Sequence, residues 1–398
     1  MTSSSEQNPA VKVTLVDILK TGFTLCCRLP WVVGTTLLRR WWPWSTYKPP
    51  PLKEHLFRHV MTCFGNHIPL SIWQWGSTRD TSGSNLRTST RYSHIPHLFE
   101  SVRREEFSGY WFCRGIAENI VQPRDADIVL LHAHGGGYVA VHPSVCAPEW
   151  AFLAEVLQKH GITTAIFSLD YTLAPRGVFP KQRDEIAAAY DWINKDMGVD
   201  VSKIVVVGDS AGGHLIMSLL VRLHEMQQQN LNTNGDAIDL RPKAAVLISP
   251  WVNLYTSHPR TLELYWEERL HKGSLDSYCE MLLRDASPEA AQIYGNFAVG
   301  RDVRGSWTDI LPPRTLVTAG SDELVFIYDI EDFVKQARAD GADVALDIAD
   351  GQNHTWQCAE AFMQQGRLLD LPMGEDLPDD LMPGFQALAM DILKLIRN

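Results

Sequence analysis

The chain has few cysteines, and their spacing carries no motif. Seven are scattered over 398 residues without a Cys-x-x-Cys pair. This odd, dispersed set argues against a disulfide framework or a zinc ribbon and favours a reducing compartment. The first dozen residues also lack a charged segment followed by an apolar core, so the sequence predicts no secretory signal. We therefore expect an intracellular protein, either cytoplasmic or peripherally associated with a membrane.

The chain is also short of positive charge and of long apolar runs. Its formal net charge is −11, which argues against a nucleic-acid partner, because such a partner needs a basic face. The charge-free stretch at 29–38 is ten residues long, whereas a helix that crosses a bilayer takes about 20. Three histidines, His132, His134 and His142, lie close together, but no acid or cysteine completes a ligand set. We expect neither a metal nor an organic cofactor.

From about residue 127 onward, short apolar runs alternate with helical patterns. The runs show no polar alternation, which is typical of strands buried on both faces of a parallel sheet. Helical patterns such as those at 150–157 and 330–337 place apolar residues at i, i+3, i+4 and i+7. The sequence therefore predicts an α/β fold of the α/β-hydrolase type, with a mostly parallel central sheet and helices on both faces. The predicted strands are 128–131, 162–169, 204–207, 244–248, 315–318 and 344–348.

Two regions break this rhythm. Residues 1–115 contain no clear strand run, and the stretch that follows the strand at 244–248 is irregular and rich in aromatics. Both lie where an α/β core accepts a lid, namely before its first central strands and after the carboxyl end of a strand. We therefore expect an amino-terminal segment with cap helices at 1–115. The catalytic domain is expected at 116–398, with a cap insertion at about 252–307. Residues 227–239 are predicted to form a surface loop.

The strongest chemical signal is a serine at the apex of a predicted strand–turn–helix unit. Ser210 lies in the run Gly208-Asp209-Ser210-Ala211-Gly212, between an apolar strand and a helical stretch. A Gly-x-Ser-x-Gly turn needs small neighbours because the strand and the helix approach closely there. The turn projects the serine hydroxyl above the sheet, where a base can take its proton. Ser210 is therefore the predicted nucleophile.

A second element, His134-Gly135-Gly136-Gly137, also follows an apolar strand directly. A glycine-rich loop in this position offers backbone N–H groups to a developing oxyanion. The same loop also fits a dinucleotide-binding fingerprint. That interpretation fails on context, since Pro143 interrupts the helix that the fingerprint requires. We therefore interpret the loop as part of an oxyanion hole.

An activated serine needs a base, and the base needs an orienting carboxylate. In α/β hydrolases the chain order is Ser, then Asp or Glu, then His, each on a loop after a strand. The strand at 315–318 runs into Asp322, and the strand at 344–348 runs into His354. We therefore predict Asp322 as the orienting acid and His354 as the acid and base. The rival acids are Glu323, Asp329 and Asp350, and the rival histidines are His214, His258 and His271.

These motifs and their order resemble those of the hormone-sensitive-lipase family of α/β hydrolases, over roughly residues 110–360. The resemblance implies carboxylic-ester hydrolysis through an acyl-enzyme, with the oxyanion held by the amides of Gly136, Gly137 and Ala211. It also implies a helical cap built from the amino-terminal segment and from an insertion. Besides the serine, acid and histidine contexts, the motifs are His134-Gly135-Gly136-Gly137, Asp170-Tyr171-Thr172-Leu173-Ala174-Pro175, Phe179-Pro180 and Ser249-Pro250-Trp251.

The amino-terminal segment differs chemically from the rest of the chain. Residues 1–60 carry eight Lys or Arg against three acids, and residues 15–44 combine a polar helical stripe, an apolar stripe and the run Trp41-Trp42-Pro43-Trp44. A basic amphipathic helix followed by tryptophans is suited to a membrane interface. The alternative is a cap helix that packs its apolar stripe over the active site. We expect the cap role, with peripheral membrane contact through residues 12–44 as a secondary property.

We predict a serine hydrolase that cleaves carboxylic esters, specifically short-acyl or acetyl esters of a bulky apolar alcohol such as a sterol or a secondary metabolite. Its expected partner is thus a small-molecule ester. One rival is a transacylase or other non-hydrolytic tailoring enzyme on the same triad, which must exclude water from the acyl-enzyme. The other is a small-molecule receptor of the same fold, against which an intact triad argues. The bulk of the alcohol is inferred from aromatics in the cap regions: Trp31, Trp41, Trp42, Trp44, Trp73, Trp75 and Trp251.

Overall fold

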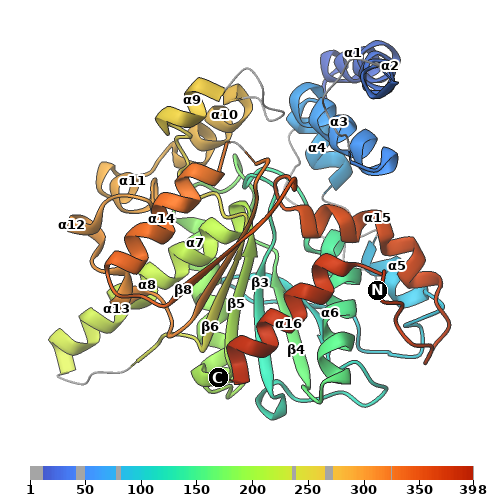
Figure 1. The fold of residues 1–398 in the computed structure, drawn as a ribbon. Coiled ribbons are helices and arrows are strands. Elements are labelled where there is room, and N and C mark those ends of the chain that lie inside the picture. The colour runs from blue at the N-terminus through green and yellow to red at the C-terminus, as the bar shows by residue number, and fades with distance from the viewer. Residues whose placement is uncertain are drawn as a thin grey trace.

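The protein is described here by a computed structural model, which covers residues 12–41, 50–77, 82–234, 239–264, 272–323 and 325–397. A central sheet of order β1-β2-β4-β3-β5-β6-β7-β8 runs through the molecule (Figure 1). β2 pairs antiparallel with β1 and β4, and the other pairings are parallel. The strands are β1 Glu100–Arg103, β2 Ser108–Arg114, β3 Ile128–Ala133, β4 Thr164–Leu169, β5 Ile204–Asp209, β6 Ala244–Ile248, β7 Thr315–Gly320 and β8 Val344–Ala349.

Helices occupy most of the connections between the strands and much of the amino-terminal region. The α-helices are α1 Leu15–Phe23, α2 Leu29–Trp41, α3 Leu52–His67, α4 Leu70–Ser77, α5 Ser82–Thr88, α6 Ala147–Lys159, α7 Lys181–Asp191, α8 Ala211–Asn234, α9 Pro259–Leu264, α10 Lys272–Leu283, α11 Pro288–Tyr294, α12 Arg301–Arg304, α13 Trp307–Ile310, α14 Ile327–Ala339, α15 Trp356–Asp370 and α16 Pro383–Arg397.

Apolar layers cover both faces of the sheet, as the sequence predicts. Successive side chains of a strand point to opposite faces. In β5, Val206 packs in the layer that holds α7, α8 and α14, whereas Val205 and Val207 pack in the layer that holds α6 and α16. All three valines are fully buried. The predicted α/β fold with a mostly parallel sheet is therefore confirmed.

The structure differs from the sequence prediction in two places. Residues before 115 contain two strands of the sheet, β1 and β2, where no strand was expected. β1 is a four-residue edge strand of mixed polar sequence whose residues are half-buried or exposed, so it leaves no apolar run in the sequence. The predicted loop at 227–239 is also wrong in its first part, because α8 continues to Asn234.

The amino-terminal helices lie at the end of the sheet where α9 and α10 also lie (Figure 1). α1 begins at a capping box in which Thr14 accepts from the amide of Asp17 and Asp17 accepts from the amide of Thr14. A short π-helical turn, Thr24–Arg28, joins α1 to α2, and α2 packs against α3. Among the described residues, no helix has both the length and the apolar character that crossing a membrane requires.

Candidate active site

Ser210 occupies a sharp turn between β5 and α8. Its φ is +52°, a left-handed conformation that few residues with a side chain adopt, and its amide donates to the carbonyl oxygen of Ile248 at 2.9 Å. A Cβ atom on Gly212 would lie 1.9 Å from the carbonyl oxygen of Ala133, and one on Gly208 would lie 2.3 Å from that of Gly212. The turn therefore forms only with glycines on either side of the serine.

A continuous chain of hydrogen bonds links Ser210 to a histidine and a carboxylate. Nε2 of His354 lies 2.9 Å from Oγ of Ser210, and Nδ1 of His354 lies 2.7 Å from Oε2 of Glu323. A carboxylate only accepts, so Nδ1 carries the histidine proton and Nε2 is left to accept from the serine hydroxyl. The histidine ring also stacks on Phe326, with ring centroids 4.4 Å apart. This arrangement suits removal of the Ser210 proton.

The carboxylate of Glu323 is fully buried and satisfied on both oxygens. Its Oε1 accepts from the amide of Gly320 at 2.6 Å and from the hydroxyl of Ser249 at 2.9 Å, while Oε2 faces His354. Ser249 in turn accepts from the amide of Thr355, which follows the histidine in the chain. These bonds fix the carboxylate in one orientation, because each oxygen has its own donors.

The sequence prediction of Asp322 as the orienting acid is wrong by one residue. The Asp322 side chain is 58% exposed and points to Arg58, whose Nη1 lies 4.0 Å from its Oδ2. After β7 the chain turns, with the amide of Glu323 donating to the carbonyl of Gly320, and this turn directs residue 323 inward. The apolar periodicity of a strand or helix does not extend into such a turn. The sequence therefore gave no signal for which of the two adjacent acids, Asp322 or Glu323, points inward.

The other rival residues have partners elsewhere. Asp329 is buried against Asn253, and burial raises its pKa to about 6. His214 is buried between the hydroxyl of Tyr138 and a backbone carbonyl, and burial lowers its pKa to about 4. His258 pairs with Asp332 at 3.2 Å, and Asp350 is exposed. His271 lies outside the described residues.

The glycine-rich loop after β3 lies against the serine turn. Gly136 and Gly137 have φ values of +108° and +63°, which favour glycine. Oδ2 of Asp209 accepts from the amide of Gly135 at 3.0 Å, and the hydroxyl of Tyr171 donates to the carbonyl of His134 at 2.8 Å. Asp209, the last residue of β5, and Tyr171, which follows β4, thus hold the glycine loop in place.

Three amides at this site have no acceptor within the part of the chain that the structure describes. They belong to Gly136, Gly137 and Ala211, the residues predicted for the oxyanion hole. Tyr278 of α10 covers the loop, since a Cβ on Gly137 would lie 2.8 Å from its ring. Neither Tyr278 nor Asp209 was predicted to have a role, because only the fold brings α10 and the acid of the serine motif to this loop.

The three histidines between 132 and 142 contact neighbouring side chains within the fold. His134 stacks on Tyr171, and burial lowers its pKa to about 3. Nδ1 of His132 lies 2.8 Å from the hydroxyl of Ser168, and His142 lies against Ser144. Across the described residues, no group of three or more His, Cys, Asp or Glu side chains is placed to hold a metal ion.

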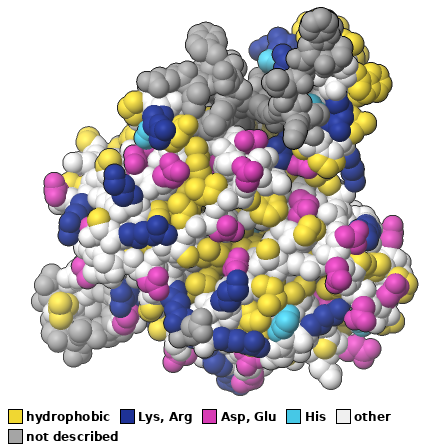
Figure 2. All heavy atoms as spheres, in the orientation of Figure 1, with side chains coloured by type: hydrophobic (Ala, Val, Ile, Leu, Met, Phe, Trp, Pro, Cys, Tyr) yellow, Lys and Arg dark blue, Asp and Glu magenta, His cyan; other side chains and the backbone are white. Residues whose placement is uncertain are grey.

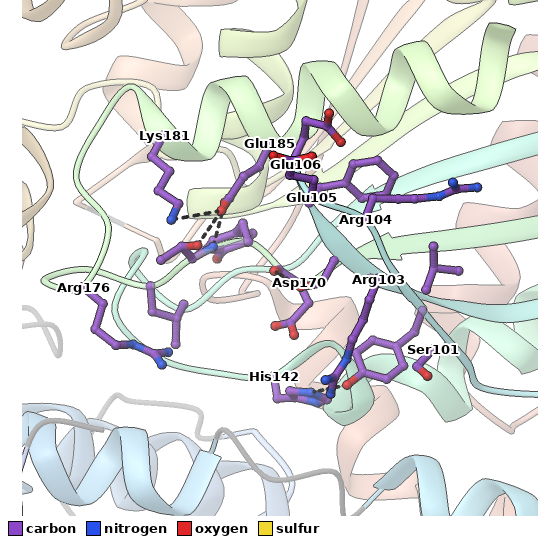
Figure 3. Close-up of a pocket in the computed structure, with 18 of the residues that line it drawn as sticks. Ser101, Arg103, Arg104, Glu105, Glu106, His142, Asp170, Arg176, Lys181 and Glu185 are labelled. Carbon is purple, nitrogen blue, oxygen red and sulfur yellow. Dashed lines mark hydrogen bonds and ion pairs between the residues drawn. The ribbon is translucent and has the colours of Figure 1, made fainter. Parts of the chain in front are cut away.

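A polar cavity of about 520 Å³ is lined by residues of β1 and β2, by His142 and by the segment that begins at Asp170. Figure 3 shows Asp170 projecting into this space between Arg176 and Arg103, while Lys181 and Glu185 lie on its far wall. Burial raises the pKa of Asp170, and the neighbouring positive charges oppose that shift. None of Ser210, Glu323 and His354 lines this cavity. It is therefore separate from the serine–histidine–glutamate chain.

Comparisons with known proteins identify the family of this chain. A model of the family described as alpha/beta hydrolase fold matches residues 130–358. The chain belongs to the hormone-sensitive-lipase family of α/β hydrolases. It is accordingly a carboxylic ester hydrolase.

Relatives of this hydrolase are distant. Esterase LipU of Mycobacterium tuberculosis is 22% identical over 306 residues, which cover 76% of this chain and 91% of that protein. Steryl acetyl hydrolase 1 of Saccharomyces cerevisiae is 26% identical over 215 residues, which cover 50% of this chain and 46% of that protein. A crystal structure described as a hormone-sensitive lipase from a metagenome library aligns with a TM-score of 0.60 at 20% identity. That alignment covers 86% of this chain and 98% of the other, and it shows the shared fold.

Proposed function

We propose that this hydrolase cleaves short-acyl or acetyl esters of a bulky apolar alcohol, through an acyl-enzyme formed on Ser210. The observation that carries the proposal is the hydrogen-bond chain from Glu323 through His354 to Ser210, next to three amides without acceptors. A base oriented by a buried carboxylate activates a serine, and free amides stabilise the negative charge that then develops.

In the proposed mechanism, Nε2 of His354 takes the proton of Ser210 as Oγ attacks the ester carbonyl. The carbonyl oxygen becomes negative and is held by the amides of Gly136, Gly137 and Ala211. His354 then gives the proton to the alcohol oxygen, the carbon–oxygen bond breaks, and the acyl group stays on Ser210. A water molecule, deprotonated by the same histidine, releases the acid and restores the serine. Glu323 stabilises the charged histidine in both halves.

An apolar cluster beside the glycine loop supports a bulky, apolar substrate. Leu70 and Trp73 of α4 and Tyr278 and Met281 of α10 pack against the chain that follows the loop. Two cap helices thus bring apolar side chains to the site. The tryptophans from which the sequence analysis inferred a bulky substrate differ in exposure. Trp251 is buried in the core, whereas Trp31 and Trp41 are exposed. Trp42 and Trp44 lie outside the described residues.

The similarity to steryl acetyl hydrolase 1 of Saccharomyces cerevisiae supports the choice of acetyl esters as substrates. Partial exposure of the base favours hydrolysis over acyl transfer, which must exclude water, since the side chain of His354 keeps 20% of its surface exposed. The receptor alternative needs no hydrogen-bonded triad, and this chain keeps one. These observations together support an esterase that acts on a small-molecule ester.

The substrate class is tested with two series of esters. p-Nitrophenyl esters of rising acyl length report on the acyl side, and acetates of rising alcohol size, up to a steryl acetate, report on the alcohol side. We expect kcat/KM to be highest for acetate to butyrate and to be retained for bulky acetates. A maximum at long acyl chains, with no turnover of bulky acetates, would contradict the proposed class.

We also propose the division of the chain into a cap and a catalytic domain. The cap combines the amino-terminal helices α1–α4 with the insertion at 252–307, which contains α9–α12. The sheet begins at Glu100, so the amino-terminal part of the cap ends before that residue rather than at 115.

We further propose that residues 12–44 contact a membrane surface peripherally. Eight large apolar side chains of α1 and α2 are more than half exposed, and Figure 2 shows hydrophobic side chains gathered at this corner of the molecule. Basic residues accompany them, which suits an anionic lipid surface. The apolar stripe of α1 is therefore directed away from the core, and among the amino-terminal helices of the cap it is α3 and α4 that contact the loops of the site. The eight side chains are Leu15, Val16, Ile18, Leu19, Phe23, Trp31, Leu38 and Trp41.

A further inference from the structure

The acid and the base of the site come from neighbouring loops that are tied to each other. The loop at 320–323 follows β7, and the loop at 350–355 follows β8. The amide of Asp322 donates to the carbonyl of Gln352 at 2.8 Å, and the amide of Gly351 donates to the hydroxyl of Ser321 at 2.8 Å. A Cβ on Gly320 would lie 2.1 Å from the carbonyl oxygen of Gln352. The position of His354 therefore depends on how the second loop is held.

One side chain from the cap reaches both loops. Nη1 of Arg58, on α3, donates to the carbonyl of Gly351 at 3.1 Å, and Nη2 donates to Oε1 of Gln352 at 2.9 Å. The same guanidinium faces Asp322 at 4.0 Å and pairs with Glu54 one turn earlier on α3. Its side chain is 4% exposed. A guanidinium buried this deeply needs its partners, so these contacts are not interchangeable surface pairs.

The histidine loop borders a cavity on the side that faces α3. A cavity of about 300 Å³ lies between α3 and α15, lined by Phe57, Arg58, Asn353 and Trp356 among others. Across this cavity, hydrogen bonds from Arg58 to Gly351 and Gln352 join the loop to α3. The guanidinium crosses the edge of this cavity and supplies those contacts.

We propose that Arg58 is a positioning residue for His354, through which the docking of the amino-terminal cap sets the geometry of catalysis. The inference rests on the proposed function of Ser210 and His354. The proposal also gives the exposed Asp322 a role, because its carboxylate is, with that of Glu54, one of the two acids that face the Arg58 guanidinium. The cap thus acts on the chemical step, in addition to any contact that it makes with substrate.

The experiment compares three variants by kcat and KM on p-nitrophenyl acetate, with kcat divided by the active sites titrated with a fluorophosphonate. Arg58→Gln removes the charge and the fork of donors, and Arg58→Lys keeps the charge with one donor group. Lys53→Gln is the matched control, because Lys53 anchors the same helix to the carbonyl of Met363, away from the histidine loop. Hydrogen exchange of the peptide covering 350–355 reports on the loop independently of activity.

Arg58→Gln is expected to lower kcat about 10²-fold, the order of loss that follows a misplacement of about 1 Å, with KM changed less than twofold. Arg58→Lys should recover part of that loss, and Lys53→Gln should match wild type. Exchange at 350–355 should rise in Arg58→Gln alone. Wild-type kcat in Arg58→Gln, an equal loss in Lys53→Gln, or an effect confined to KM would overturn the inference. The proposed function fails separately, if the wild-type enzyme neither labels nor turns over.

Discussion

Oε2 of Glu323 lies 2.7 Å from Nδ1 of His354, while the neighbouring Asp322 points away from the histidine toward Arg58. The two acids are adjacent in the chain, yet one is fully buried and the other is largely exposed. A carboxylate that must stabilise a charged histidine acts best where water does not screen it. The geometry therefore assigns the orienting position to Glu323.

Exchanging each acid for its amide tests this assignment. Glu323→Gln favours the wrong histidine tautomer, so kcat should fall by roughly 10⁴, the loss seen for the same change in a serine-protease triad. Asp322→Asn, the matched control, should lower kcat no more than about tenfold, since it weakens only a 4.0 Å contact with Arg58. Steady-state kinetics on a p-nitrophenyl ester measure both. A greater loss in Asp322→Asn than in Glu323→Gln would show that the structure misassigns the acid.

The sequence predicted the parts of the site that depend on strand ends. Ser210 and the glycines at 135–137 follow fully apolar runs, and His354 follows a run in which Asp347 is the one charged residue. Parallel strands bring their carboxyl ends to one edge. The orienting acid could not be predicted in the same way. Asp322 and Glu323 follow the same strand, and which of them turns inward depends on a bond between the amide of Glu323 and Gly320.

The edge of the sheet was missed for a related reason. Val102 is the single strongly apolar residue of β1, and in β2 a short apolar stretch is flanked by Ser, Gly and Arg. Neither segment has the long apolar pattern that marks the central strands in the sequence. β1 depends mainly on its pairing with β2, whereas β2 buries Trp111 and Phe112 in the two apolar layers. Contacts between remote segments, such as Tyr278 over Gly137, carry no local pattern at all.

Stability is expected to depend on pH through Glu149. This carboxyl is buried on α6 and accepts from Nε2 of Gln365 at 2.8 Å, and burial raises its pKa to about 8. An unfolded Glu has a pKa of about 4.3, so between these values the folded chain holds a proton that the unfolded chain releases. The free energy of unfolding should therefore fall as pH rises from about 5 to 8.

Urea unfolding of Glu149→Gln measures this contribution. The variant cannot ionise at that position, so its stability should fall less between pH 5 and pH 8 than that of the wild type. Glu331→Gln serves as the control because Glu331 is exposed on α14 and should leave the wild-type dependence unchanged. Equal pH dependence in the wild type and Glu149→Gln would mean that Glu149 does not carry it.

Membrane contact through α1 and α2 is tested by flotation with vesicles of neutral lipid and of neutral lipid with 30% anionic lipid. The wild type should bind the anionic vesicles, and the binding should weaken with salt, at about 1 kcal/mol per basic residue near the surface. The double variant Trp31→Ala and Trp41→Ala should weaken binding at least about tenfold, because the free energy of transferring each ring from water into the membrane is lost. Activity on a short soluble ester should not change.

The matched control is Trp75→Ala, which removes an exposed ring of the same size from α4. It should leave vesicle binding intact. The alternative is that the exposed apolar surface of α1 and α2 binds a second copy of this chain, and sedimentation velocity detects such a dimer. A wild-type dimer that the double tryptophan variant dissociates, with no affinity for either vesicle, would show that the apolar surface joins two copies instead.

The central claim is that Ser210 is the nucleophile of an ester hydrolase. Its most direct test is covalent labelling with a fluorophosphonate probe, followed by mass mapping of the modified peptide. The wild type should be labelled once, at Ser210, with loss of esterase activity in proportion, and Ser210→Ala should show neither labelling nor turnover. Undiminished labelling or turnover in Ser210→Ala would contradict the account.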